Sequence, residues 1–416
     1  MLIRARFNET GLNHLQGGTG LFRDASAARR GDGPDKTVTR YGFRAPDGAT
    51  CYSFYAHALF SAFVEASISW KAQRAIGIES ESALDDHPGM QLPIIDISTI
   101  NTADENVRHK VAKELDRICS TIGFFQVIGH SVPSELIAAT ATSARDFFSR
   151  PLEEKLRVSQ PTPRTIRGYI PKGRGALAYT RANQSPPDYK QSFSIGPPPE
   201  VSARLDFQTG QTRHYEVNRW PNRPRHFQSN CSAYYESMEV LSLQILQLIA
   251  RALNVEDARL EQTLHNHVSV LGLAHYPAQD EPVEPGQLRC GAHSDFGTLT
   301  ILWPEQRSAG LEVLDKRGRW RSVFARDDAF VVNIGDVLEH WTGGRWRSTM
   351  HRVVNPTAED SHLDRLSLGY FQHPNPNTSM TSLFASAEPA CARGDIVNTV
   401  GTYLDAKFSS QVRSTE

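Results

Sequence analysis

The sequence predicts an α+β protein with a mainly β core, built as a barrel or a double-sheet jelly roll with helices at its flanks. After residue 268, apolar residues recur with a period of two in several short runs separated by turn signals, as in antiparallel strands. Before that point apolar residues recur at helical spacing, most clearly over residues 225–253. With 416 residues, of which 39% are hydrophobic, the chain is long enough to bury such a core.

The first 90 residues differ in composition from the rest of the chain. Residues 17–48 are rich in Gly, Arg and Asp and show little apolar periodicity, which predicts loop or disorder. Residues 52–70 carry an untidy helical pattern. We therefore expect residues 1–90 to be an amino-terminal extension that is poorly ordered or partly helical.

Regular elements are first legible between residues 91 and 151. Residues 92–97 and 123–128 are short β-branched or aromatic runs that predict strands. Between them, Thr102 and Glu105 make a capping-box pattern that opens a helix with one apolar stripe. Pro133 opens another helix, where its missing N–H costs nothing, and Pro151 ends it.

Residues 161–224 are dense in Pro, Gly and Asn, so we expect them to be largely irregular. A loop of this length inside a compact domain is usually functional, and we interpret it as a cover over a substrate. The longest helical pattern follows, over residues 225–253. Its apolar face is continuous and consists of Cys231, Tyr234, Met238, Leu241, Ile245, Leu248 and Ala252.

The strand patterns of the carboxyl-terminal part should form the β core, with a helix after them. They cover residues 268–276, 297–303, 311–314, 329–334, 348–354 and 365–371. The chain is thus expected to divide into the extension at 1–90, a helix-and-strand region with covering loops at 91–255, and the jelly-roll core at 256–416.

Composition excludes several classes of protein. Lys plus Arg number 45 and Asp plus Glu 46, which argues against a surface that binds nucleic acid. The five cysteines are scattered and form no CxxC pair, so we expect neither a disulfide scaffold nor a zinc–thiolate site, but a reducing, cytoplasmic location. No run of about twenty apolar residues predicts a membrane span. The oligomeric state stays open, with a monomer expected.

Three residues in the β region have the chemistry of a facial metal triad. His293 and Asp295 are two positions apart, so on an extended segment both side chains lie on one face. His351 belongs to a later strand, which a jelly roll can bring alongside. Two imidazoles and one carboxylate suit non-haem Fe(II) and leave coordination positions open. A His-x-Asp pair alone is more often an ordinary surface turn, so the hypothesis depends on all three residues.

A possible anchor for a keto acid follows the triad. Arg365 and Ser367 share one face of a strand, and a guanidinium can pair with a carboxylate through two parallel hydrogen bonds. The opposite face of the strand carries the apolar residues Leu366, Leu368 and Tyr370, so we expect that face to pack against the core. The alternative is a solvent-exposed arginine. Tyr276 is a candidate second donor to the acid, or simply a tyrosine at a strand end.

From residue 92 onwards the chain resembles the isopenicillin N synthase-like group of Fe(II)/2-oxoglutarate-dependent oxygenases. The resemblance implies a double-stranded β-helix core with flanking helices. The motifs that carry it lie at residues 92–97, 123–130, 167–169, 190–193, 219–222, 293–295, 333–336, 348–351 and 365–367.

The resemblance also implies an activity, namely hydroxylation or desaturation of a small organic molecule in specialised (secondary) metabolism. O2 is consumed, and succinate and CO2 are released. In this interpretation His293, Asp295 and His351 are catalytic and bind iron, while Arg365, Ser367 and Tyr276 bind 2-oxoglutarate. We expect the substrate to meet four aromatic residues, which are Phe296, Tyr169, Tyr179 and Phe193.

Two departures from the family pattern keep alternatives open. Ala274 stands where plant-type members often carry Asn, and Gln191 stands where Glu is common. The namesake enzyme uses its Arg-x-Ser pair for a peptide and needs no keto acid. An iron-dependent oxidase that does not use 2-oxoglutarate, and a non-catalytic jelly-roll binding protein, are therefore alternatives.

Overall fold

The structure is a computed structural model, and the contacts within the chain divide it into two units, Met1–Asp86 and His87–Glu416. The residues that it describes are 21–24, 40–44, 50–53, 89–99, 104–161, 165–181, 185–198, 212–279, 282–305, 310–381 and 399–411.

The first unit contains a small antiparallel sheet, with strands in the order β1 (Leu21–Asp24), β2 (Arg40–Arg44) and β3 (Thr50–Ser53). The expectation of loop or disorder over residues 17–48 is therefore wrong for β1 and β2. In β2 the alternation of Tyr41 and Phe43 with polar residues or glycine covers only five positions, too few to stand out in a sequence. A helix was expected over residues 52–70. Residues 52 and 53 belong to β3 instead, and the rest of that range lies outside the described residues.

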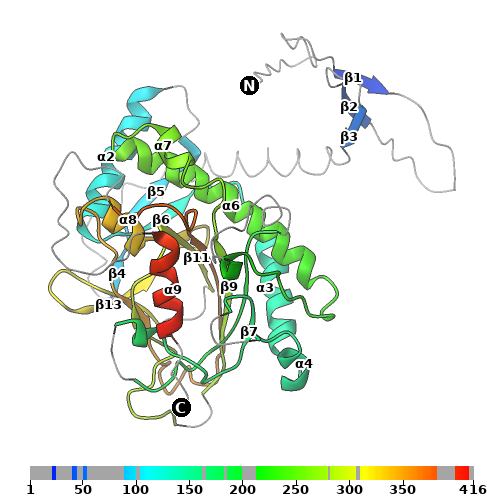
Figure 1. The fold of residues 1–416 in the computed structure, drawn as a ribbon, viewed down its shortest axis with the longest axis vertical. Helices are drawn as coiled ribbons and strands as arrows, with labels where there is room; N and C mark the ends of the chain where they lie inside the picture. Colours follow the sequence, from blue (N-terminus) through cyan, green and yellow to red (C-terminus); the bar gives the residue numbers. More distant parts are fainter. Residues whose placement is uncertain are drawn as a thin grey trace, which may run out of the picture. The chain divides into compact units, whose positions relative to one another are not determined.

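The second unit is built on two β-sheets (Figure 1). The larger has eight strands, in the order β5 (Ile94–Asp96), β6 (Phe124–Ile128), β14 (Phe330–Ile334), β11 (Leu299–Pro304), β16 (Arg365–Gln372), β9 (Val270–Tyr276), β8 (Gln191–Ile195) and β7 (Gly168–Ile170). The smaller has five, in the order β10 (Cys290–His293), β15 (His351–Val353), β12 (Leu311–Leu314), β13 (Trp320–Phe324) and β4 (Met90–Gln91).

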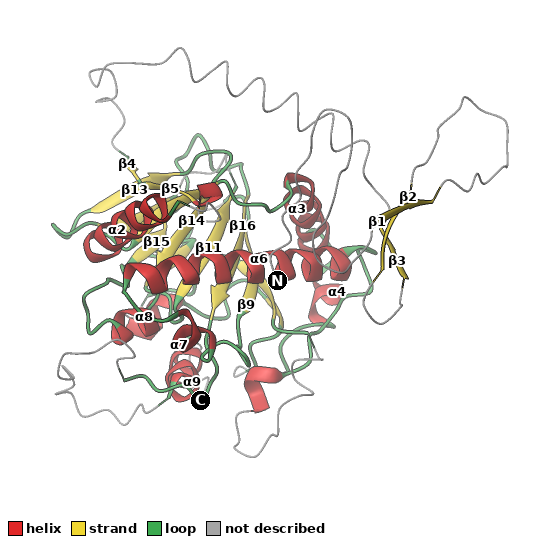
Figure 2. Cartoon of the chain, turned by 90° about the horizontal axis from the view of Figure 1, so that it is seen from above, coloured by secondary structure: helices red, strands yellow, loops and turns green. Residues whose placement is uncertain are grey.

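Helices cover the large sheet, and Figure 2 shows α6 running across it with α3 nearby. The α-helices are α2 (Glu105–Thr121), α3 (Ser134–Phe148), α4 (Leu152–Leu156), α6 (Phe227–Ala252), α7 (Asp257–Glu261), α8 (Asp336–Trp341) and α9 (Val400–Ser410). The described residues also include three short 3-10 helices, η1 (Ile97–Thr99), η2 (Leu177–Arg181) and η3 (Thr212–Tyr215). None of the helices in the described ranges is long and apolar enough to span a membrane.

The start of α2 differs from the predicted capping box. Asp104 is the N-cap, and its carboxylate accepts a hydrogen bond from the backbone N–H of Asn106 at 2.9 Å. The helix therefore begins at Glu105, because a short acceptor directly before it satisfies one of the free N–H groups of its first turn. Thr102 lies outside the described residues.

Each strand of the large sheet divides its side chains between two environments. In β16, Leu366, Leu368 and Tyr370 are fully buried in the main apolar core, which they share with α6. The alternate residues, among them Arg365 and Ser367, line a cavity on the other face. Successive side chains of a strand point to opposite faces, so one strand serves both the core and the cavity.

The predicted α+β fold with a mainly β core is confirmed, and so is the long helix. All six predicted carboxyl-terminal strands are present with small shifts of their ends. Residues 161–224, expected to be largely irregular, contain β7 and β8, which extend the large sheet beyond β9. Strands of three to five residues carry too few alternations to be distinguished from loop.

Substitution of one of two leucines on α6 should show how the fold depends on this core. Leu241 is 2% exposed and Leu243 is 39% exposed. We expect Leu241→Ala to lower the free energy of unfolding by about 2–5 kcal/mol, because it leaves a cavity under the helix. Leu243→Ala should cost less than about 1 kcal/mol. Urea denaturation followed by circular dichroism measures both, and equal losses would contradict this account of the helix face.

Candidate metal centre

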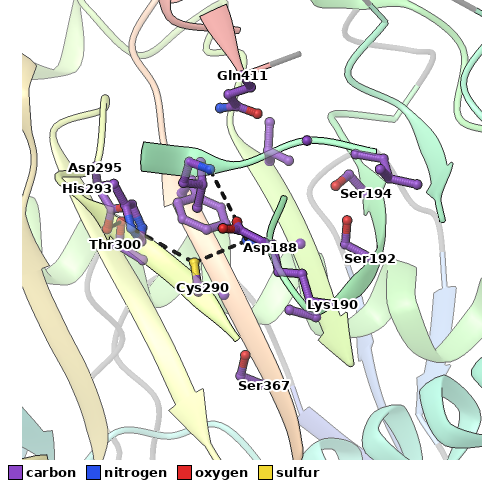
Figure 3. A pocket seen from close by; sticks show the side chains of 18 of the residues that line it. Asp188, Lys190, Ser192, Ser194, Cys290, His293, Asp295, Thr300, Ser367 and Gln411 are labelled. Carbon is purple, nitrogen blue, oxygen red and sulfur yellow. Dashed lines mark hydrogen bonds and ion pairs between the residues drawn. The ribbon is translucent and has the colours of Figure 1, made fainter. Parts of the chain in front are cut away.

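A cavity of about 260 Å³ lies between the two sheets. Residues of both sheets line it, among them His293 and His351 from the small sheet and Arg365 and Ser367 from the large one. Figure 3 shows His293, Asp295 and Thr300 together on one side of this pocket and Ser192 and Ser194 on the other. The predicted metal and keto-acid residues thus face one cavity.

The three residues of the predicted triad lie together in this cavity. His293 ends β10 and pairs directly with His351, the first residue of β15, while Asp295 follows β10 by two positions. Asp295 Oδ1 lies 3.8 Å from His293 Nε2 and 3.7 Å from His351 Nε2. All three side chains are buried, and their ligand atoms lie within 4.8 Å of one another. In the described part of the chain, no other group of His, Cys, Asp and Glu meets this spacing.

Backbone carbonyls orient both imidazoles toward the centre of the triad. His293 Nδ1 donates to the carbonyl of Gly291 at 2.8 Å, and His351 Nδ1 donates to that of Thr349 at 3.1 Å. A carbonyl only accepts, so each proton is on Nδ1 and each Nε2 keeps its lone pair for a metal. Burial lowers the pKa of both imidazoles, for His351 to about 4, so both are neutral at physiological pH.

The carboxylate of Asp295 is held by one of its two oxygens. Oδ2 accepts hydrogen bonds from the Thr300 hydroxyl at 2.6 Å and the Asn333 amide at 2.7 Å. Burial raises the pKa of Asp295, but the two histidines and these hydrogen bonds outweigh burial and hold it below its usual range. Two neutral imidazoles and one ionised carboxylate that face the same cavity suit a divalent transition metal with open positions.

Arg365 presents a buried cation that makes no ion pair with a residue in the described ranges. Its side chain is 1% exposed, and neither Nε nor Nη1 has a hydrogen-bond partner among the described residues. Tyr276 pairs with it across the strands, and the guanidinium carbon lies 5.0 Å from the centre of the tyrosine ring. Burial raises the pKa of Tyr276, so its hydroxyl stays protonated and can donate. Ser367 faces the same space. A carboxylate in the cavity would satisfy the open positions of this guanidinium.

Aromatic side chains and one histidine also line the cavity. Phe296, Phe371 and Phe408 belong to it, and the rings of Phe296 and Phe408 meet edge to face. The Phe371 ring lies close over the backbone of Gly369, where an added Cβ would come within 3.2 Å of the ring. His373 is 3% exposed, and its Nδ1 has no hydrogen-bond partner. The cavity therefore combines an aromatic wall with polar side chains, among them His373, Ser192 and Ser194.

Three of the four aromatic residues proposed to touch a substrate do not line the cavity. Tyr169 and Phe193 are buried in the main core, where both rings pack against Phe147. Phe193 pairs with Leu273, a core residue of β9, so the alternation of β8 sends Ser192 and Ser194 to the cavity instead. Tyr179 donates its hydroxyl to the carbonyl of Ser185 at 3.1 Å. Of the four, Phe296 lines the cavity.

The two residues that depart from the family pattern, Ala274 and Gln191, lie in different surroundings, one in the cavity and one outside its lining. Ala274 faces the cavity beside Ser367, so no side-chain amide stands at that position. Gln191 lies outside the cavity lining and instead joins β8 to its neighbours. It accepts hydrogen bonds from Lys155 and Tyr169 and contacts His275.

The sequence analysis gave no role at the site to several residues that line it, although Lys190 and Asn333 stand within family motifs. These residues are Thr300, Asn333, Phe371, His373, Asp188 and Lys190. Phe371 and His373 could have been found, because they continue the odd-numbered face of β16 beyond Arg365 and Ser367. The others reach the site from separate strands and loops, so no spacing in the sequence indicates them.

Comparisons with known proteins agree with this geometry. Residues 92–223 match the model for the amino-terminal region of non-haem dioxygenases in morphine synthesis, and residues 266–374 match the 2OG-Fe(II) oxygenase superfamily. Validamycin A dioxygenase of Streptomyces hygroscopicus subsp. limoneus is 30% identical over 298 residues, which are 71% of this chain and 80% of that protein. The 2-oxoglutarate-dependent dioxygenase thnC of Trichoderma harzianum is 32% identical over 276 residues, 66% and 82% of the two chains.

A solved structure is similar as well. A full-length Neurospora crassa protein in complex with alpha-KG and thymine superposes with a TM-score of 0.65 at 26% sequence identity. The match covers 77% of this chain and 96% of that one.

Loss of His351 should remove metal binding. We expect His351→Ala to weaken Co(II) binding at least about 100-fold, because only two of the three ligands remain. Absorption titration of the apoprotein under anaerobic conditions measures the affinity. His362→Ala is the matched control, because His362 lies on the surface and should leave the affinity unchanged. Metal binding of wild-type strength in His351→Ala would exclude this site.

His373 should make the fold sensitive to acid. Burial lowers its pKa from 6.5 to about 4, so between these values the unfolded chain binds a proton that the folded chain excludes. Protonation of His373 in the unfolded chain therefore lowers the free energy of unfolding as the pH falls from 6.5 to about 4, and it has no effect above this range. We expect His373→Gln to lose stability less steeply over this window in urea denaturation, whereas His362→Gln should follow the wild type. Identical pH profiles of stability for the wild type and His373→Gln would refute this role of His373.

Proposed function

The chain belongs to the 2OG-Fe(II) oxygenase superfamily, and we propose that His293, Asp295 and His351 hold its ferrous ion. The family and its relatives make the protein an Fe(II)- and 2-oxoglutarate-dependent dioxygenase that oxidises small molecules, as the sequence resemblance implied. Membership of this family favours 2-oxoglutarate use over the two alternatives, an oxidase without a keto acid and a binding protein without turnover.

The observation that carries the assignment of roles is the guanidinium of Arg365 in the same cavity as the triad, because its Nε and Nη1 have no hydrogen-bond partner among the described residues. A buried arginine without an anion is costly, and the distal carboxylate of 2-oxoglutarate supplies that anion through two parallel hydrogen bonds. Ser367 and Tyr276 add hydroxyl donors beside it. The keto and carboxylate oxygens at the other end of 2-oxoglutarate suit the open positions of the metal.

The protein's own part in the reaction is to bind, orient and exclude water. When bound, Fe(II) and 2-oxoglutarate supply the oxidising chemistry with O2 and release succinate and CO2. Thr300 and Asn333 keep one oxygen of Asp295 occupied, which leaves its other oxygen for the metal. The apolar walls keep bulk water from the reacting groups and hold the substrate carbon in place.

We infer a compact substrate with an apolar or aromatic body and one hydrogen-bonding group. The wall formed by Phe296, Phe371 and Phe408 suits a flat apolar ring, and the free Nδ1 of His373 suits one polar atom. The similar Neurospora crassa protein was solved with thymine, a ring of this kind. Hydroxylation and desaturation are both compatible with such a pocket.

We propose that the protein works as a cytoplasmic monomer on this small molecule, without a nucleic-acid or membrane partner. Its balanced charge supports the absence of a nucleic-acid partner. Cys119, Cys231 and Cys290 are buried free thiols, which suits a reducing compartment.

The assignment of Arg365 is tested through 2-oxoglutarate affinity. We expect Arg365→Lys to weaken 2-oxoglutarate binding about 10- to 100-fold, because an ammonium cannot replace the two-pronged contact. Anaerobic titration of the visible charge-transfer band at saturating Fe(II) measures the affinity.

The matched control is Arg352→Lys. Arg352 lies on β15 outside the cavity, where it pairs with Glu312 and stacks over Trp320. This variant should bind 2-oxoglutarate as the wild type does. Equal affinity in Arg365→Lys and the wild type would overturn the proposed role.

A further inference from the structure

We propose that Asp188 is a positioning residue for the metal centre, which acts through the backbone of β10 on the direction of the His293 imidazole. The proposal rests on the proposed function of His293 as a metal ligand. Asp188 makes no hydrogen bond to any of the three triad side chains in the contacts of the described residues; it reaches His293 through Gly291.

The first step concerns the free edge of the strand that carries His293. β10 is the outermost strand of the five-stranded sheet and pairs with β15 on one side only. Its pairing is also irregular, because the register shifts between Cys290 and His293. An edge strand presents unpaired backbone N–H groups and is held less firmly than a central strand. The position of His293 therefore needs support from outside the sheet.

Asp188 supplies that support. Its Oδ1 accepts the backbone N–H of Gly291 at 2.9 Å, and its Oδ2 accepts the backbone N–H of Leu177, at the start of η2, at 3.2 Å. One carboxylate thus ties β10 to η2, and Figure 3 shows Asp188 beside Cys290 in the pocket. Asp188 is 3% exposed, so water does not compete for these hydrogen bonds.

Gly291 passes this restraint to the imidazole. Its N–H is held by Asp188, and its carbonyl accepts the Nδ1 proton of His293 at 2.8 Å. The backbone is also closely packed here, because a Cβ on Gly291 would lie 2.8 Å from Cβ of Ala178. Residues that orient a metal-binding histidine in this way tune the affinity of the site.

The negative charge of Asp188 is balanced locally. Lys190 Nζ lies 3.1 Å from Asp188 Oδ2 and 3.2 Å from the sulfur of Cys290, the first residue of β10. Burial raises the pKa of Cys290 to about 12, so the sulfur is a neutral thiol that accepts from the ammonium. Asp188 and Lys190 therefore form a neutral pair, so Lys190 does not compete with the guanidinium of Arg365 for the co-substrate.

The test compares two substitutions of Asp188. We expect Asp188→Ala to weaken Co(II) binding about 10- to 100-fold and to shift the visible Co(II) absorption bands, because the His293 ring loses its fixed direction. Asp188→Asn should give an intermediate affinity, since its amide oxygen can still accept the N–H of Gly291. At saturating metal, both variants should keep the 2-oxoglutarate affinity within about twofold, because the Arg365 anchor is untouched.

The matched control is Asp146→Asn, at an exposed position on α3, which should match the wild type in metal affinity and spectrum. Should Asp188→Ala fail to fold, Asp188→Asn decides by itself, and its apoprotein melting temperature separates metal binding from stability. Wild-type Co(II) affinity and unchanged bands in the folded variants would overturn the proposal. Failure of the proposed metal site would appear differently, as wild-type Co(II) affinity in His351→Ala.

Discussion

The alternation of side chains along the strands of the large sheet is the constraint on which the site depends. β16 sends Leu366 and Leu368 into the core shared with α6, and Arg365 and Ser367 into the cavity. A shift of one residue in its pairing would bury the guanidinium in the core and empty the anchor. Packing of the apolar face against α6 opposes such a shift, so the stability of the core and the placement of the anchor have a single origin.

Charge balance in the cavity follows from this arrangement. Asp188 and Lys190 neutralise each other, and the carboxylate of Asp295 stands alone among neutral imidazoles. The combined positive charge of a ferrous ion and the Arg365 guanidinium would exceed that one negative charge. In the proposed function, a keto-acid dianion between the metal site and Arg365 would restore neutrality, so the two proposed sites are expected to share one cavity.

The sequence predicted more of the carboxyl-terminal core than of the segment that closes the cavity. Arg365 and Ser367 were recognisable because β16 is long enough to show its alternation, with apolar residues at every second position. Tyr169 and Phe193 were misassigned because β7 and β8 are short and lie in a segment rich in proline and glycine. Only the strand pairing shows that these aromatic side chains face the core. Phe193 lies opposite Leu273 of β9, about 80 positions away, and Tyr169 lies opposite Phe193.

The sequence alone determined the chemical types at the site, because ligand identity and two-residue spacing are local properties. His293 and Asp295 share a face on any extended segment, as do Arg365 and Ser367. Tertiary structure decided which distant groups join them: His351 beside His293, Thr300 and Asn333 on Asp295, and Asp188 on the backbone of Gly291. Those contacts come from strand order and register, which arise from packing of the whole sheet and leave no local pattern in the chain.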